Sequence, residues 1–429
     1  MPVKKLREEF LLSVKNFVKH DFGLVLLEAA KWLILSGLVG IIVGSASALF
    51  LESLNWATSY RETHLWIISL LPVAGLIIGT GYHYWGKEVV KGNNLLIEEL
   101  QSPQKVIPLI MAPLIFAGTI ITHLFGGSAG REGTAVQIGG AFADQFTKIF
   151  KLNARDRKII LICGISAGFA SVFGTPLAGA IFGLEVFVMG SLMYNAILPS
   201  FITAIIADYA CKTWGLGHTH YSISAVPEIN MINLLISLSA GIIFGLAARS
   251  FSAMNHFVSK LFSYIKYPPL RPFLGGFILI ALIYLIGNTR YIGLGIPTIS
   301  ESFTQQEHYY TFAIKLFLTA LTLGSGFKGG EVTPLFFIGA TLGSFLSVFI
   351  PLPVGLLAGM GFVAVFSGAA NTPLACVFMG MELFGTSSGI YIALACVTAY
   401  LFSGHTGIYQ SQKIGSPKHL LLKRHQFFK

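Results

Sequence analysis

The stretch GGSAGREGTAVQIGG, residues 126–140, decides how this chain can fold. It follows an apolar run and opens with three glycines within five residues. Such a cluster breaks a helix within a membrane, which is tolerated only where the freed backbone faces protein or a wet cavity. A helix that begins after the break points free N–H groups and the positive end of its dipole into the interior. The stretch therefore predicts a buried site for an anion or a carboxylate.

Glu132 stands at the mouth of this predicted site, followed by Gly133 and Thr134 in the first helical turn. A carboxylate inside a membrane costs several kcal/mol unless it is paired, so Glu132 is a candidate functional residue. We expect it to occupy the anion site while ionised and to leave it when protonated. The alternative is a simple ion pair with Arg131.

The composition of the chain indicates a membrane protein. Of its 429 residues, 54% are hydrophobic and 11% are charged, whereas soluble domains carry about a quarter charged residues. Several apolar stretches approach the roughly 20 residues that span a hydrocarbon core. The clearest are Trp32–Phe50, Leu65–Tyr82, Ile107–Ile121, Ala196–Ala207, Ile232–Ala247, Phe273–Ile286 and Tyr391–Phe402. The sequence predicts an all-α, multi-pass membrane protein.

Basic residues gather at both ends of the chain, at Lys4, Lys5, Arg7, Lys15 and Lys19 and at Lys413, Lys418, Lys423, Arg424 and Lys429. The positive-inside rule then predicts that both termini are cytoplasmic, with an even number of crossings of the cell inner membrane. No short apolar segment with a cleavage site precedes the first span, so no cleaved signal peptide is expected. We interpret the net charge of +10 as a sign of how the chain is oriented in the membrane. We therefore expect no nucleic-acid partner.

An internal repeat divides the chain. Thr175-Pro176-Leu177-Ala178 recurs as Thr372-Pro373-Leu374-Ala375, 197 residues later (372 − 175), and Glu185 and Glu382 follow at equal distances. Further glycine breaks occur at 92–94, 324–330 and 404–407. Repeats with broken helices are typical of transporters whose substrate site lies near the membrane midplane. We expect a cytoplasmic segment 1–24, repeats 25–212 and 230–416, a linker 213–229 and a tail 417–429.

The break at 329–334 predicts the equivalent helix start in the second half. Val332 and Thr333 would supply N–H groups and a hydroxyl to an anion, although Thr333 could instead be a plain helix cap. Glu331 is a second carboxylate at the same depth and a candidate proton relay, unless it lies outside the path.

Two other breaks add weaker candidates. Tyr409 follows the last break and could turn its phenol to the same centre, but an aromatic near a membrane end is often an interfacial anchor. Asn93 or Asn94 could donate an amide hydrogen bond to an anion, or serve only as turn residues after Gly92.

The remaining polar residues indicate no further chemistry. Glu185 and Glu382 are expected to bond backbone groups at helix ends, and His123 is expected to pack. Cys163, Cys211, Cys376 and Cys396 are expected to be buried thiols. No metal-ligand spacing and no nucleophile–base pair occurs, so we expect neither a metal nor a cofactor and no enzyme activity.

Together these motifs resemble the CLC family of chloride channels and anion/proton antiporters, over about residues 25–416. The resemblance rests on Gly130-Arg131-Glu132-Gly133, Val136 to Gly140, Pro176 to Gly179, Gly329-Gly330 with Pro334, and Tyr409. It implies a homodimer with one pore per subunit, each pore built from two inverted halves around a central anion site. It also implies that Glu132 is the external gating glutamate.

Departures from the chloride-transporting pattern resemble the fluoride-exporting branch of that family. Thr134 stands where chloride-transporting members usually have Pro after the gating Gly-Arg-Glu-Gly motif. Asn93 lies in the run that replaces their Gly-Ser-Gly-Ile-Pro. Val186 stands at the position of the inner proton-transfer glutamate of chloride antiporters. Glu331-Val332-Thr333 replaces Ile-Phe-Ala. Fluoride is small and strongly hydrated, so strong donors must replace its water. The resemblance implies a proton-coupled fluoride antiporter, with a chloride/proton antiporter or a passive anion channel as alternatives.

Overall fold

A computed structural model describes residues 22–418. The basic residues before Phe22 and after Lys418, on which the predicted topology mainly depends, lie outside the described residues, as do most of the predicted segments 1–24 and 417–429. The described chain is mostly helical, with a single two-stranded pairing.

The first half of the chain runs through eight α-helices, from the long α2 to α9. They are α2 (Phe22–Thr63), α3 (Leu71–Tyr84), α4 (Asn93–Gln101), α5 (Met111–Leu124), α6 (Glu132–Ile149), α7 (Ala154–Phe173), α8 (Pro176–Glu185) and α9 (Ile197–Thr213). Short 3₁₀ segments, η2 (Leu65–Leu70), η3 (Lys87–Val89) and η4 (Tyr194–Ala196), join some of them.

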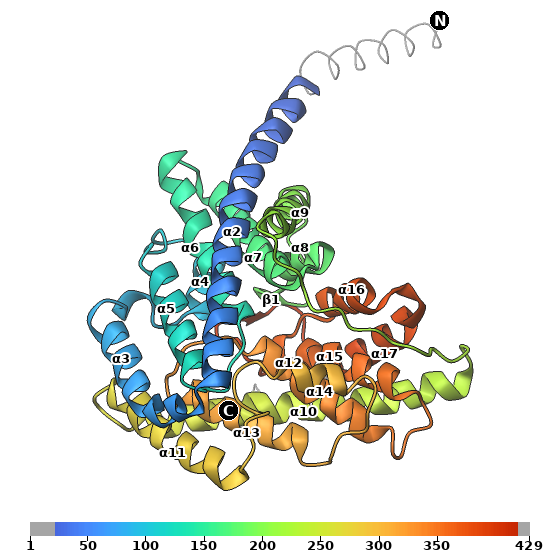
Figure 1. Cartoon of the computed structure of the whole chain (residues 1–429). Coiled ribbons are helices and arrows are strands. Elements are labelled where there is room, and N and C mark those ends of the chain that lie inside the picture. The colour runs from blue at the N-terminus through green and yellow to red at the C-terminus, as the bar shows by residue number, and fades with distance from the viewer. Residues whose placement is uncertain (1–21, 419–429) are drawn as a thin grey trace, which may run out of the picture.

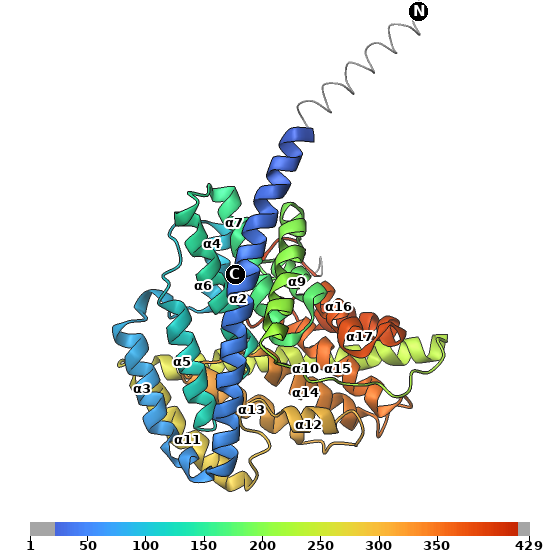
Figure 2. The same cartoon turned by 45° about the horizontal axis from the view of Figure 1, so that its top comes forward.

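The second half repeats this order. Its helices are α10 (Met231–Ser263), α11 (Leu270–Ile286), α12 (Ile296–Glu301), α13 (Thr311–Gly324), α14 (Val332–Leu346), α15 (Val354–Ala370), α16 (Pro373–Phe384) and α17 (Gly389–Phe402), with η5 (Thr386–Ser388) before α17. Figures 1 and 2 show most of the first half, blue to green, apart from most of the second half, orange to red, while the yellow α11 of the second half lies beside α3 of the first.

The predicted apolar spans all fall on helices, with two adjustments. Leu65–Tyr82 is η2 followed by α3, because Pro72 suits a first helical turn and cannot continue one. Ile107–Ile121 becomes helical only from Met111. Four helical segments of the described chain are long and apolar enough to cross a membrane: Gly23–Thr63, Leu65–Tyr84, Tyr194–Thr213 and Met231–Ser263.

Two central helices were not among the predicted spans. In α15 every residue from Gly355 to Ala370 is buried, and α7 is nearly as enclosed. Such helices are apolar all round because protein surrounds them on every side. Each packs against the broken helix before it at glycines: a Cβ on Gly139 of α6 would lie 2.1 Å from the carbonyl oxygen of Gly164 in α7, and one on Gly339 of α14 would lie 2.0 Å from that of Gly361 in α15.

Glutamates at the ends of α8 and α16 tie the two halves together. The Glu185 carboxylate accepts hydrogen bonds from the backbone N–H groups of Leu374 (3.1 Å) and Ala375 (2.9 Å) at the start of α16. The Glu382 carboxylate accepts from Leu177 (3.0 Å) and Ala178 (2.8 Å) at the start of α8. The predicted backbone-bonding role is confirmed, but each acid serves the other repeat.

This exchange fixes the relation between the halves. The end of α8 meets the start of α16 and the start of α8 meets the end of α16, so these equivalent helices run in opposite directions. The fold is therefore an all-α membrane fold made of two inverted repeats.

The segment after α17 returns to the first half. The strand β2 (Lys413–Ile414) pairs in parallel with β1 (Val188–Met189), just after α8. The Ser411 backbone N–H donates to Asn94 Oδ1 (3.0 Å), and the Gln412 amide donates to the Val186 carbonyl (2.8 Å). These contacts hold the segment between α4 and α8.

Replacing Glu185 by Ala should destabilise the protein by about 2 kcal/mol, because two N–H groups at the start of α16 lose their acceptor in a buried place. The melting temperature in detergent measures the effect. Glu382→Ala should cost less, since Glu382 is less buried than Glu185. Glu52→Ala, at an exposed position on α2, is the control; a Glu185→Ala variant as stable as this control would contradict the assignment.

Candidate functional site

The first residues of α6 and α14 meet at the centre of the molecule. Gly126 (φ 88°) and Gly326 (φ 108°) end the preceding helices in a conformation that disfavours other residues. The Gly130 N–H donates to the Gly330 carbonyl (2.6 Å) and the Gly330 N–H donates to the Gly130 carbonyl (2.7 Å). Both predicted breaks are confirmed, and this reciprocal pair holds two helix N-termini together.

Glu132 is fully buried at this junction. Its Oε2 accepts a hydrogen bond from the backbone N–H of Thr333 (3.0 Å), and its Oε1 accepts one from the Thr333 hydroxyl. The backbone N–H of Arg131 also donates to Oε2 (3.2 Å). A carboxylate from α6 thus lies where the first N–H groups of α14 would bind an anion.

The two interpretations of Glu132 coexist in this geometry. Arg131 Nε lies 3.5 Å from Glu132 Oε1, so the ion pair forms. The shorter contacts, however, go to Thr333 on the other repeat. The carboxylate is therefore compensated by both a cation and a helix start.

Thr333 does not cap its own helix. The N-cap position of α14 is Glu331, without a side-chain cap, and the Thr333 hydroxyl donates to Glu132 instead. Val332 is the first residue of α14 and is buried at the same junction.

A small cavity with a volume of about 10 Å³ lies close to the start of α6. Asn93, Val136, Val186 and Tyr409 line it, together with Leu96, Ile97, Ile165 and Phe182. Tyr409 is 6% exposed, so it lies inside the protein rather than at a membrane surface. Residues from α4, α6, α8 and the C-terminal segment meet here.

Asn93 and Gly133 touch in this region. A Cβ on Gly133 would lie 2.9 Å from Asn93 Nδ2, 3.2 Å from the Gly330 Cα and 3.6 Å from Glu331 Oε2. Asn93 Oδ1 and Glu331 Oε2 are buried and have no hydrogen-bond partner among the described residues. The start of α6 is thus approached by an amide donor and by a second carboxylate.

Two of the sequence candidates have other partners. The Thr134 hydroxyl bonds the Thr119 hydroxyl of α5 (2.7 Å), which leaves only its backbone N–H for the helix start. Asn94 Oδ1 accepts from the Ser411 backbone, so Asn94 positions the C-terminal segment. His123 is buried with its Nε2 3.5 Å from the Gly130 carbonyl oxygen.

A separate cavity of about 20 Å³ is lined by Glu132 and shares no lining residue with the cavity at Asn93. Arg131, Glu132 and Thr333 line it, and so do His218, Thr219 and Tyr221 of the segment between α9 and α10. Burial lowers the pKa of His218 below its ordinary value, against the opposing effect of Asp208. Sequence reasoning treated this segment only as a linker, because it contains no motif; only its packing brings it to Glu132.

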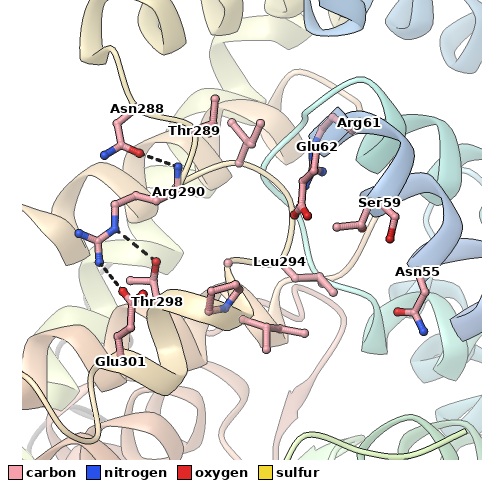
Figure 3. A pocket seen from close by; sticks show the side chains of 15 residues that line it. Asn55, Ser59, Arg61, Glu62, Asn288, Thr289, Arg290, Leu294, Thr298 and Glu301 are labelled. Atoms are coloured by element: carbon pink, nitrogen blue, oxygen red, sulfur yellow. Dashed lines mark hydrogen bonds and ion pairs between the residues drawn. The ribbon is translucent and has the colours of Figure 1, made fainter. Parts of the chain in front are cut away.

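A larger cavity of about 620 Å³ shares Ile296 with this one. In Figure 3, Arg61 and Glu62 at the end of α2 face it from one side and Arg290 from another. Arg290 pairs with Glu301 (3.5 Å) and Glu307 (2.7 Å), while Arg61 lies 3.6 Å from Glu62 and donates to the His123 carbonyl (2.8 Å). Both guanidinium groups lie close to carboxylates, so the positive charges that line this cavity are compensated.

Among the described residues, no group of three or more His, Cys, Asp or Glu side chains is arranged to hold a metal ion. The four cysteines are buried and unpaired, as predicted.

Comparison with known proteins agrees with this geometry. Residues 74–404 match the sequence profile of the voltage gated chloride channel family. The chain belongs to this CLC family. A curated relative from Pseudomonas syringae pv. tomato, described as a "Chloride/fluoride channel protein", is 53% identical over 400 residues, covering 91% of this chain and 88% of the relative.

Solved CLC structures share the fold. The crystal structure of a CLC-type fluoride/proton antiporter superimposes with a TM-score of 0.88 at 35% identity, covering 91% of this chain and 99% of that one. A slow cyanobacterial Cl⁻/H⁺ antiporter superimposes with a TM-score of 0.77, covering 93% and 98%; at 19% identity it shows the fold alone. The resemblance to the CLC family inferred from the motifs is confirmed, and the family consists of transporters and channels rather than enzymes.

Replacing Gly133 by Ala should destabilise this CLC protein by about 1–3 kcal/mol, as overpacking commonly does. The added methyl group would collide with Asn93 Nδ2 and crowd the Gly330 Cα. Gly81→Ala on α3 is the matched control, since a Cβ there meets nothing within 4 Å. Thermal unfolding in detergent compares the two variants; equal melting temperatures would show that the two helix starts can move apart freely.

Proposed function

We propose that this CLC protein is a proton-coupled antiporter that exports fluoride from the cytoplasm. One observation carries the proposal: the Glu132 carboxylate occupies the start of α14, bound by the N–H and the hydroxyl of Thr333. A side chain that bears both a negative charge and a titratable proton thus occupies a place suited to an anion.

The gating step follows from this arrangement. While ionised, Glu132 fills the anion position and closes the path. On taking up a proton it loses the charge that binds it to the helix start and Arg131, so it leaves and an anion takes its place. The proton and the anion therefore pass the same position in alternation, which couples proton influx to fluoride efflux.

The donors around the site suit fluoride. Fluoride gives up its water at a high free-energy cost, so the site must offer strong, close hydrogen-bond donors. The Thr333 hydroxyl already donates to a carboxylate oxygen, and the Asn93 amide and the Tyr409 phenol border the cavity beside Gly133. Val186 lines the same cavity where chloride/proton antiporters carry the inner glutamate. The solved fluoride/proton antiporter at 35% identity supports this choice of anion and of coupling.

Glu331 is our candidate for the inner proton relay. Its carboxylate lies beside the start of α6, where a Cβ on Gly133 would lie 3.6 Å from Glu331 Oε2. A proton held by Glu331 is therefore close to the start of α6, which carries Glu132.

We further propose that the protein lies in the cell inner membrane with both termini in the cytoplasm, and that two copies form a dimer. Apolar side chains exposed on α8, α9, α16 and α17 support the dimer: Leu177, Leu198, Ile205, Leu374, Phe378 and Val397.

In proteoliposomes, an imposed proton gradient should drive fluoride uphill, with chloride moved much more slowly. Glu132→Gln should abolish the coupled proton movement, because the amide cannot carry the proton. Fluoride electrodes and a pH-sensitive dye follow the two ions.

Each of the other possible results of this transport experiment would assign a different function to the protein. Chloride movement equal to that of fluoride would reject the fluoride assignment in favour of a chloride/proton antiporter. Fluoride flux without proton movement in the unaltered protein would make it a passive channel, in line with the word "channel" in the Pseudomonas relative's description. Unchanged proton transport in Glu132→Gln would refute the gating role.

Asn93→Leu should weaken fluoride binding by about tenfold or more, since a hydrogen bond to a charged group contributes roughly 1.5–3 kcal/mol. Leucine has nearly the same size and no donor. Isothermal titration with fluoride measures the change. Leu95→Asn, two residues along the same helix, is the control that changes polarity at a neighbouring position; an affinity unchanged in Asn93→Leu would remove Asn93 from the anion path.

A further inference from the structure

A cavity of about 250 Å³ opens at the seam between the end of α3 and the start of α11. Basic side chains line it from four separate segments: His83 of α3, Lys87 of η3, Arg271 of α11 and Lys328 of the break before α14. Of the described residues that line this basic cavity, none is acidic. The cavity is therefore suited to a negatively charged group.

The two helices of the seam are antiparallel and touch at glycines. A Cβ on Gly79 of α3 would lie 2.7 Å from the Cα of Pro269, and one on Gly276 of α11 would lie 2.6 Å from the Cα of Pro72. The end of α3 thus meets the start of α11. Gly79 also lines the basic cavity, so the close contact continues to the edge of the cavity.

Lys328 brings to the basic cavity a charge that no contact within the chain neutralises. Its ammonium lies 4.1 Å from the centre of the Tyr82 ring, and an added Cβ on Gly118 of α5 would lie 3.0 Å from the Lys328 Cβ. Among the described residues, Nζ has no hydrogen-bond acceptor and no carboxylate within 4.0 Å. A cation in such a place is stabilised when an anion joins it.

Arg271 is fixed in position by the chain before α11. Its Nε donates to the Ile265 carbonyl (3.0 Å) and its Nη2 donates to the Ser263 carbonyl (3.2 Å). Neither acceptor is charged, and no carboxylate of the described chain lies within 4.0 Å of the guanidinium. Arg271 therefore presents an uncompensated charge and further N–H groups that can donate to a phosphate.

Exposed aromatic side chains mark the depth of the basic cavity in the membrane. Tyr84 and Trp85 stand at the end of α3, and Tyr264 and Tyr267 stand before α11; all four are exposed. Tyrosine and tryptophan gather where a bilayer meets water. The basic cavity thus lies at the level of the lipid headgroups.

Apolar surface continues from the cavity along both helices. The exposed side chains there are Val73 and Ile77 on α3 and Leu274, Phe277 and Ile278 on α11. Because the helices are antiparallel, both sets lie on the same side of the cavity. Figures 1 and 2 show α3 and α11 at the outer edge of the molecule, away from α16 and α17, which carry part of the proposed dimer face. In that dimer the apolar surface faces lipid.

We propose that the basic cavity binds the phosphate group of an anionic phospholipid, whose acyl chains lie against the exposed apolar side chains of α3 and α11. Basic cavities between membrane helices bind such headgroups. Lys328 and Arg271 donate to the phosphate, and Lys87 at the rim adds electrostatic attraction. The lipid supplies the anion that Lys328 lacks within the chain.

A phosphate bound to Lys328 acts on the centre of the molecule through the backbone. Lys328 stands two residues before Gly330, whose N–H and carbonyl bond Gly130. Holding the lysine therefore restrains the break that leads into α14, and the lipid stabilises the folded protein by binding it. This inference does not depend on the proposed antiport.

In detergent, phosphatidylglycerol should raise the melting temperature more than phosphatidylcholine with the same acyl chains, because only the former has a net negative charge. Native mass spectrometry of the protein with both lipids measures the affinities. Lys328→Met should weaken phosphatidylglycerol binding by about tenfold or more, as expected when a hydrogen bond to a charged group is lost. Lys148→Met, exposed at the end of α6, removes the same charge away from the cavity and should bind like the unaltered protein.

A second variant keeps the test decisive if Lys328→Met does not fold. Lys87 is exposed at the rim of the cavity, so its replacement disturbs no core packing. Lys87→Glu should weaken phosphatidylglycerol binding by about two- to fivefold, in keeping with an exposed charge pair. Lys148→Glu is the matched control.

The remaining outcomes would each overturn the proposal. Equal binding of the two lipids would remove the role of charge. An unchanged phosphatidylglycerol affinity in Lys328→Met, or in Lys87→Glu where Lys328→Met does not fold, would remove the site from this cavity. Inorganic phosphate that raises the melting temperature as much as phosphatidylglycerol at the same concentration would make the ligand a soluble phosphate. A change of oligomeric state in Lys87→Glu with unchanged lipid binding would make the occupant a second copy of the chain.

Discussion

Two reciprocal hydrogen bonds between the backbones of Gly130 and Gly330 hold the start of α6 against the start of α14. The pair requires that both helices begin in the middle of the protein, and that both positions lack a side chain, since a Cβ on Gly130 would lie 2.9 Å from the Gly330 carbonyl oxygen. It also sets the distance over which Glu132 reaches Thr333. Most other features of the centre follow from this backbone contact.

Bringing two helix N-termini together creates a region of positive potential that favours a negatively charged group. Each start presents unpaired N–H groups and a partial positive charge, worth up to about 2 kcal/mol for a favourably placed anion. The Glu132 carboxylate supplies such a negative charge, but at the cost of burying a carboxylate. The balance between these two terms accounts for the Glu132 side chain at the start of α14. Under the proposed function, a small anion would compete for the same place.

The inverted repeat stabilises this centre from its periphery. Glu185 and Glu382 each bond the N-terminus of the other repeat's helix, so neither α8 nor α16 is complete without its counterpart. The pairing of β1 with β2 then returns the end of the chain to the first half, next to Val186. Val186 carries no titratable proton, so under the proposed antiport the proton relay is a residue other than Val186. Glu331, on the opposite repeat, is the carboxylate that the geometry brings beside Gly133 at the start of α6.

Local patterns in the sequence determined several features of the fold and of the site. Glycine clusters, an apolar composition and a repeated Thr-Pro-Leu-Ala motif depend only on neighbouring residues, so the helix breaks, the membrane fold, the buried glutamate and the CLC family could be recognised from them. Contacts between distant segments could not. Only the tertiary structure shows that Tyr409 and Asn93 line one cavity and that the Thr134 hydroxyl bonds the Thr119 hydroxyl. Only the tertiary structure shows that Glu185 and Glu382 each bond the other repeat. It also shows that His218 lines a cavity with Glu132. The physical reason is that a residue pattern specifies which groups must be buried or bonded, whereas the partner that satisfies each group is chosen by packing across the whole chain.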